Sequence, residues 1–124
     1  MEDGKRISFD RGIEILQEVR ELCKELPQVE EIIDGFGHVS FKVNRKSFII
    51  MGEDEQGQLG LSFKSDLETQ QLLIQQGGFV KTPYIGRHGW VSVKSSDLDL
   101  DKDGLCDLLK EAYYRAAPKR LRSK

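Results

Sequence analysis

The stretch from His38 to Met51, HVSFKVNRKSFIIM, decides the fold because two strand-like runs flank a tight reversal. In the run 38–43, valine and phenylalanine alternate with polar residues, as in a strand that buries one face. Asn44 and Arg45 form the reversal, and the apolar run 47–51 returns as a second strand. The stretch therefore predicts an antiparallel β-hairpin.

The same patterns predict strands and helices on both sides of this hairpin. Further strands are expected over 29–34, 59–63 and 90–94, and residues 79–82 are expected to be extended. Because the first strands follow one another through short reversals, an antiparallel meander is favoured over a parallel sheet. Apolar residues at helical spacing predict helices over 9–26, 65–76 and 101–116.

Capping residues mark the ends of the expected helices. Ser8 is expected to cap the first helix, and Pro27 to end it. Ser65 and Glu68 match a capping box at the start of the second helix. The expected inward residues of that helix are Leu67, Leu72 and Leu73.

These elements predict a single α+β domain over residues 1–124, an antiparallel sheet of about five strands with helices covering one face. A basic C-terminal tail follows from about residue 118. No run is long and apolar enough for a membrane span, and the first ten residues are too polar for a secretory signal. Cys23 and Cys106 lie among leucines and are expected to be buried thiols. The expected location is therefore the cytoplasm.

Motifs for catalysis and metal binding are incomplete. Asp99, Asp101, Asp103 and Gly104 resemble the start of a calcium-binding loop, but Lys110 stands where the closing glutamate belongs. An aspartate there is expected to cap the following helix instead. No nucleophile motif occurs, and a lone histidine is weak evidence for a general base. We expect no metal, cofactor or catalytic residue; the sequence leaves enzymatic activity open and favours a non-enzymatic protein.

The segment from Lys81 to Val93, KTPYIGRHGWVSV, combines a proline, large aromatics, glycines and an arginine–histidine pair. A polar turn between large aromatics is typical of a surface site on a rigid frame. The flanking glycines can expose backbone N–H groups beside the guanidinium, which suits an anion. One alternative is therefore a small-ligand or anion-binding pocket, although a lone tryptophan on a strand is more typical of the core. The candidate pocket residues are His38, Tyr84, Arg87, His88 and Trp90.

Basic residues also gather at both expected turns and in the tail, an arrangement that suits phosphate contacts by two β-ribbons on a duplex. The formal net charge of −2 argues against a strong nucleic-acid binder unless these bases share one face. A protein–protein adaptor that uses an exposed sheet face is a third alternative. The candidate nucleic-acid contacts are Lys42, Arg45, Lys46, Arg87, His88, Lys94, Lys119 and Arg120.

Three segments resemble the MmcQ/YjbR family of small bacterial proteins: GFGHVSFKV with a following K-x-F, TPYIGRHGWVSV, and LLKEAYYRAAPKRL. Their order and spacing agree from about residue 31 to residue 121. The resemblance implies a CyaY-like (frataxin-like) α+β fold and DNA binding through a double-wing motif, without an established catalytic activity. It highlights Phe36, Gly37, His38, Phe41, Lys46, Phe48, Pro83, Tyr84, Gly86, Gly89, Trp90, Tyr113, Ala117, Pro118 and Lys119.

Overall fold

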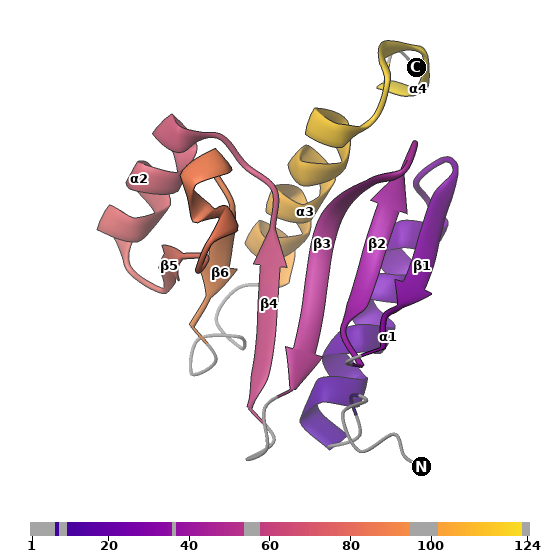
Figure 1. Cartoon of the computed structure of the whole chain (residues 1–124), viewed down its shortest axis with the longest axis horizontal. Helices are drawn as coiled ribbons and strands as arrows, with labels where there is room; N and C mark the ends of the chain where they lie inside the picture. The colour runs from indigo at the N-terminus through magenta and orange to yellow at the C-terminus, as the bar shows by residue number, and fades with distance from the viewer. Residues whose placement is uncertain (1–6, 8–9, 36, 54–57, 95–101, 123–124) are drawn as a thin grey trace.

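The computed structural model describes residues 7, 10–35, 37–53, 58–94 and 102–122 of the chain (Figure 1). The elements follow one another as α1 (Asp10–Lys24), β1 (Val29–Ile33), β2 (Val39–Val43), β3 (Lys46–Glu53), β4 (Leu59–Phe63), α2 (Leu67–Gln76), β5 (Phe79–Lys81), the 3-10 helix η1 (Ile85–His88), β6 (Val91–Val93), α3 (Lys102–Ala116) and α4 (Lys119–Arg122). None of the helices in these ranges is long and apolar enough to cross a membrane.

The strands form one antiparallel sheet in the order β1-β2-β3-β4-β6-β5. Helices α1 and α3 lie behind the sheet as drawn in Figure 1, whereas α2 stands beside β5 and β6. The predicted α+β class and the antiparallel sheet packed against helices are confirmed. The sheet has six strands, one more than the five or so expected, because residues 79–81, expected only to be extended, form β5 and pair with β6.

The predicted hairpin forms with one irregularity that the sequence pattern does not show. Phe41 pairs with Ile49 while the next residue, Lys42, pairs with Ser47, so Phe48 is an additional residue on β3. This is a β-bulge, which places two consecutive residues opposite one. Phe48 and Ile49 are both fully buried as a result, and the strand contributes two large side chains to the core at one level.

Tyr113 joins three parts of the chain. Its buried ring meets Phe48 edge to face, with ring centroids 5.5 Å apart, and its hydroxyl donates a 2.8 Å hydrogen bond to the carbonyl of Pro27. Burial, with a smaller effect of Tyr114, raises the pKa of the Tyr113 hydroxyl, which therefore stays protonated and able to donate. One side chain thus connects α3 to the bulge in β3 and to the turn between α1 and β1.

The structure corrects the expected start and inner face of the second helix. The cap is Asp66, whose Oδ1 accepts a 2.7 Å hydrogen bond from the N–H of Thr69, and not Ser65, which is buried. Leu67 and Leu72 were expected to face inward, yet they are 54% and 53% exposed. The buried residues of α2 are Gln70 and Leu73. The helix packs against the short edge strand β5 and does not lie across the broad face of the sheet, so few of its residues are covered.

The two cysteines differ in their surroundings. Cys23 is buried, and desolvation, with a smaller contribution from the charge of Glu31, raises the pKa of its thiol to about 12. It is therefore a protonated, unreactive core thiol, as the sequence indicates. Cys106 is only partly buried.

We predict that Trp90→Ala lowers the free energy of unfolding by about 3–5 kcal/mol, because it empties a large buried site. The Trp90 side chain is only 7% exposed. Urea unfolding measures the loss. The matched control is Tyr84→Ala, which removes a ring that is 94% exposed and is expected to change stability by less than about 0.5 kcal/mol. Equal losses in the two variants would contradict the assignment of Trp90 to the core.

Candidate nucleic-acid interface

Two connections and the last helix lie at the same end of the sheet. The β2–β3 turn, η1 and α4 all lie at the upper end in Figure 1. The strand pairing fixes the first two of them, because β2 ends, β3 begins, β5 ends and β6 begins on this side. We call this the basic end of the sheet, defined by the turn Asn44–Arg45, η1 with Tyr84, and α4.

The β2–β3 turn presents an arginine in a backbone conformation that favours glycine. Val43 and Lys46 pair directly, so Asn44 and Arg45 form a two-residue loop. Their φ angles are 52° and 68°, as in a type I′ turn. Glycine is preferred at the second position of this turn, and an L-residue in the left-handed region costs roughly 1–2 kcal/mol. The strain places the exposed Arg45 at the tip of the hairpin.

The segment before η1 presents an aromatic ring in a similarly strained conformation. Tyr84 has φ 67° and ψ −61°, and the N–H of Ile85 donates a 2.7 Å hydrogen bond to the carbonyl of Pro83. This is a γ-turn of the rare, strained type. The Tyr84 side chain is 94% exposed. Such strain costs about 1–3 kcal/mol and collects at functional sites.

A buried glutamine on α2 holds η1 in place. Gln70 is 4% exposed, and its Nε2 donates hydrogen bonds to the carbonyls of Gly86, at 2.7 Å, and Trp90, at 2.8 Å. Sequence reasoning missed this residue because a glutamine in a polar helix gives no signal of burial. Its position three residues before the buried Leu73 was the only available indication.

Close packing fixes the other side of η1. Gly89 has φ 97°, and a Cβ there would lie 2.6 Å from the carbonyl oxygen of Ser65 and 2.8 Å from the Cα of Asp66. Asp66 in turn forms an ion pair with Arg115 on α3, with the guanidinium nitrogen 2.9 Å from the carboxylate oxygen. The backbone and side-chain hydrogen bonds with Thr69, followed by Arg115, hold the pKa of Asp66 below its usual value. The loop, the start of α2 and the end of α3 therefore form one rigid unit.

Several bases outside the basic end form ion pairs with acids. On α1, Arg11, Arg20 and Lys24 each pair with a glutamate, and Arg115 pairs with Asp66 and Glu111. Within the part of the chain that the structure describes, six exposed cations on this side of the sheet make no ion pair. They are Arg45, Lys46, Lys81, Arg87, Lys119 and Arg120.

The remaining candidate contacts are placed differently. His88 is exposed beside Arg87, whose Nε lies 3.4 Å from the imidazole Nε2. Lys42 stands on β2 directly opposite Glu30 of β1, an acid that offsets its charge. Lys94 follows β6, where its N–H donates to the carbonyl of Gly78 at the opposite end of the sheet. Lys94 is therefore not brought together with the bases of the turns.

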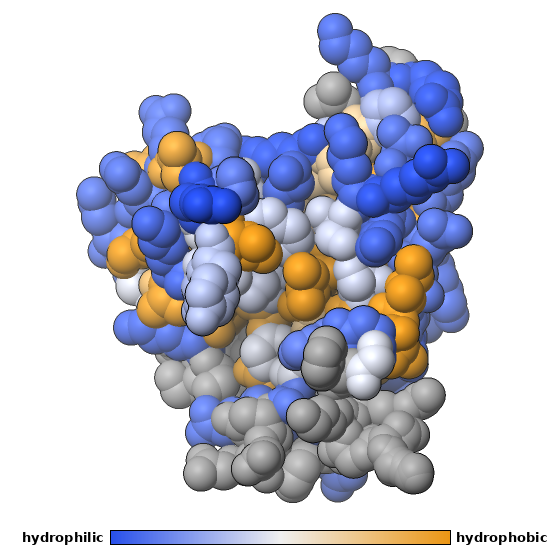
Figure 2. All heavy atoms as spheres, in the orientation of Figure 1, coloured by the Kyte–Doolittle hydropathy of each residue, from blue (hydrophilic) through white to orange (hydrophobic). Residues whose placement is uncertain are grey.

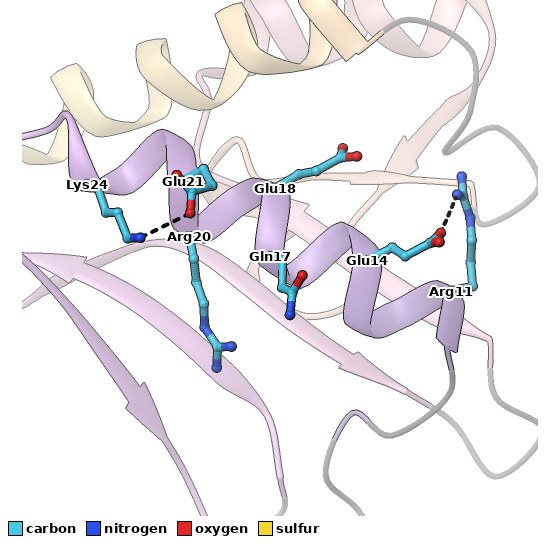
Figure 3. Close-up of a pocket in the computed structure, with 7 residues that line it drawn as sticks. All are labelled: Arg11, Glu14, Gln17, Glu18, Arg20, Glu21 and Lys24. Atoms are coloured by element: carbon cyan, nitrogen blue, oxygen red, sulfur yellow. Dashed lines mark hydrogen bonds and ion pairs between the residues drawn. The ribbon is translucent and has the colours of Figure 1, made fainter.

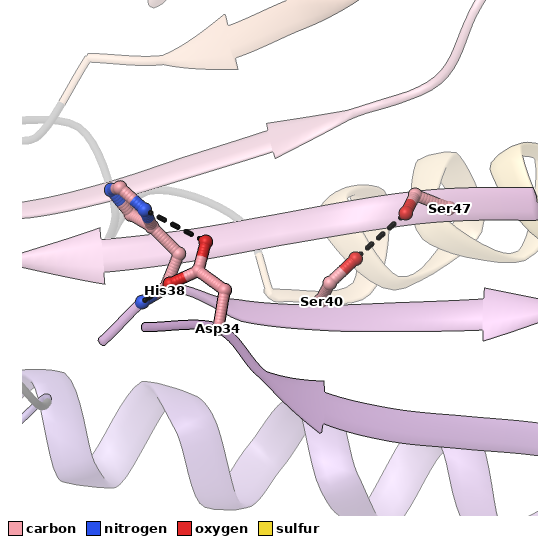
Figure 4. A network of polar contacts seen from close by, with 4 residues as sticks. All are labelled: Asp34, His38, Ser40 and Ser47. Atoms are coloured by element: carbon pink, nitrogen blue, oxygen red, sulfur yellow. Dashed lines mark hydrogen bonds and ion pairs between the residues drawn. The ribbon is translucent and has the colours of Figure 1, made fainter. Parts of the chain in front are cut away.

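The candidate pocket residues do not meet at one place. His38 precedes β2 at the end of the sheet opposite to η1; its ring nitrogen Nδ1 lies 3.3 Å from Asp34 (Figure 4). The imidazole also covers Gly52, because a Cβ there would lie 2.5 Å from the His38 ring. Near η1, Trp90 is buried whereas Tyr84 is almost fully exposed. Of the five candidate pocket residues, only Tyr84, Arg87 and His88 are exposed together in one segment.

Two of the hollows on the surface lie away from the basic end. One runs along α1 (Figure 3), where Arg11 pairs with Glu14 and Lys24 with Glu21, while Arg20 pairs with Glu31 of β1. The other lies on the open face of the sheet, which carries a pale, less polar band in Figure 2. Strand pairing places one residue from each of the six strands in a row across this face: Ile32, Ser40, Ile50, Ser62, Ser92 and Val80.

The serines of this face hydrogen-bond to neighbouring hydroxyls. The Oγ atoms of Ser40 and Ser47 are 2.7 Å apart (Figure 4). Those of Ser62 and Ser92 are also 2.7 Å apart. In the described ranges, no cluster of three or more His, Cys, Asp or Glu side chains is arranged to hold a metal ion. Asp99 and Asp101 of the calcium-like motif lie outside the described residues, as do Ser8 and Phe36.

Residues 24–115 match the model of the protein family described as YjbR. The chain belongs to the YjbR family. The matched span of this YjbR-family chain includes the β2–β3 turn, η1 and the end of α3 at Arg115, and it stops before α4. The resemblance seen in the sequence is thereby confirmed at the level of the family. A search of the curated proteins finds no match.

We predict that Arg45→Gly stabilises the domain by up to about 1 kcal/mol, because glycine adopts the left-handed conformation without strain. Urea unfolding provides the measurement. The control is Lys46→Gly, which removes a neighbouring exposed base from a strand and is expected to destabilise the domain, since glycine is unfavourable there. A less stable Arg45→Gly variant would contradict the strain assigned to this turn.

We predict that Gln70→Met lowers the free energy of unfolding by about 1–3 kcal/mol through the loss of two buried hydrogen bonds. The methionine keeps the length of the side chain but cannot donate to Gly86 and Trp90. Hydrogen exchange should also accelerate at the N–H of Gly89, which bonds to Gly86 within η1. Gln71→Met, on the exposed side of the same helix, is the control and should change neither quantity.

Proposed function

We infer that the chain is a non-enzymatic nucleic-acid-binding module, with DNA as the first expected ligand, that contacts phosphates through the two turns at the basic end. The observation that carries this proposal is the cluster of exposed, unpaired cations there, spread over the β2–β3 turn, η1 and α4. Exposed Lys and Arg side chains on two neighbouring projections suit a polyanion with regularly spaced charges. Membership of the YjbR family agrees with a double-wing arrangement, in which the turn and η1 are the wings.

The distribution of charge answers the objection raised by the net charge of −2. Asp34 follows β1 and Glu53 ends β3, so both acids stand at the end of the sheet away from the turns. Asp66 lies on the side of the turns, but its charge is compensated by the ion pair with Arg115. A dipolar molecule of this kind is steered so that its positive end meets a polyanion first. Local charge, and not the sum over the chain, therefore governs the encounter.

The small-ligand alternative has less support. A pocket near Tyr84 needs a wall, and the buried Trp90 does not supply one to the exposed residues Tyr84, Arg87 and His88. Binding pockets for small molecules enclose most of their ligand. The exposed group suits a long, flexible or extended partner better than a small anion.

We predict that the wild type binds oligonucleotides with a dissociation constant of about 10⁻⁴–10⁻⁶ M at physiological salt and much more tightly at low salt. Fluorescence anisotropy at several salt concentrations gives the affinity and its salt slope. Arg45→Ala/Arg87→Ala should weaken binding regardless of sequence and flatten the slope by about two units. Arg11→Ala/Lys94→Ala is the matched control, because it removes two bases outside the basic end.

Two results would refute the proposal. One is a wild type that binds neither duplex nor single strands at low salt. The other is an equal loss of affinity in the two double variants, because net charge rather than the basic end would then explain binding.

A further inference from the structure

Tyr84 is exposed in a way that the fold does not explain. The other tyrosines at this end have partners: Tyr113 is buried against Phe48, and Tyr114 meets the ring of Tyr113 edge to face at 5.6 Å. Tyr84 is 94% exposed and forms none of the aromatic pairs between described residues. Its ring therefore contributes little to the packing of the domain, while its backbone adopts the strained γ-turn.

The supporting structure fixes the backbone that carries this ring. Pro83 precedes Tyr84 and restricts the backbone, and η1 follows it directly. Gln70 binds the carbonyls of Gly86 and Trp90, while Gly89 packs on the start of α2. Because this backbone is already fixed, binding a ligand has to order only the side chain of Tyr84.

The surroundings of the ring indicate the chemistry of its ligand. Arg87 is exposed within the same short segment, three residues from Tyr84, and Lys81 is exposed just before it. An uncharged aromatic face beside unpaired cations suits a ligand with a flat π-system and an adjacent negative charge. A nucleotide has both, but in a duplex the faces of its base are covered by stacking with neighbouring base pairs. Single strands leave these faces available to aromatic side chains.

We propose that Tyr84 stacks on an unpaired base, and that the basic end consequently prefers single-stranded nucleic acid to duplex. The inference rests on the proposed function, because the cations of the turns hold the phosphates on either side of the stacked base. The cations supply the salt-dependent part of the affinity. Tyr84 supplies a part that does not depend on salt, since stacking displaces no counterions.

The test compares Tyr84→Ala, Tyr84→Leu and Tyr84→Phe with the wild type by fluorescence anisotropy. The probes are a thymidine oligonucleotide of about 16 nucleotides, a mixed-sequence duplex of that length, and a strand of the same length with abasic sites in place of bases. Tyr84→Ala should bind the thymidine strand about 5- to 150-fold more weakly, with an unchanged salt slope. Tyr84→Phe should keep the affinity, and Tyr84→Leu should lose it because it lacks a π-face. All four proteins should bind the abasic strand alike.

The remaining outcomes distinguish failure of the stacking inference from failure of the proposed function. The inference is wrong if Tyr84→Ala binds the thymidine strand as tightly as the wild type, if it weakens duplex and single-strand binding equally, or if Tyr84→Leu matches the wild type. In these cases the proposed function stands as long as Arg45→Ala/Arg87→Ala still flattens the salt slope. Absence of binding to all three probes at low salt would overturn both.

Discussion

The arrangement of this domain depends on the side chain of Tyr113. Its ring packs on Phe48, and its hydroxyl binds the carbonyl of Pro27 at 2.8 Å, so α3, β3 and the turn after α1 are fixed against one another. A buried hydroxyl must find a partner, and a backbone carbonyl in a turn must be satisfied as well. The single hydrogen bond meets both requirements. Because Phe48 lies close to the start of β3, the same contact also steadies the hairpin that carries Arg45.

The basic end combines a rigid base with strained tips. Every non-glycine residue with positive φ among the described residues, namely Gln28, Asn44, Arg45 and Tyr84, lies in a connection on this side of the sheet. Beneath the tips are fully buried residues such as Val43, Phe63 and Val91, which hold the strands in register. The core thus stabilises backbone conformations that local preferences disfavour, and these conformations direct a guanidinium and a phenol into solvent.

Much of this fold could be predicted from the sequence, because period-two alternation and helical spacing report burial directly. The hairpin, the antiparallel order of the first strands, the end of α1 before Pro27 and the burial of Cys23 followed from such patterns. The pattern of α2 misled, because Leu67 and Leu72 face solvent while Gln70 is buried. Burial of that glutamine depends on two carbonyls from a loop about 16 to 20 residues away, a long-range contact that local periodicity cannot report.

The candidate site was predictable in part. Arg45, Lys46, Arg87, Lys119 and Arg120 could be chosen as exposed bases from turn and tail positions, but their common location depends on the direction of each strand. The same directions separate Lys94 and His38 from the turns. The exposure of Tyr84 was also hidden, because an aromatic beside a proline corner suits a buried anchor equally well.

The bulge at Phe48 divides β3 into two parts with different alternation. From Ile49 onward, the alternation of inward and outward residues matches β2 and β4 and is tied to the core. Before Phe48, the alternation is shifted by one residue, so Lys46 and Ser47 follow a different phase from the rest of β3. Exposed side chains at the tip can therefore be exchanged while the inward positions from Ile49 onward keep their packing.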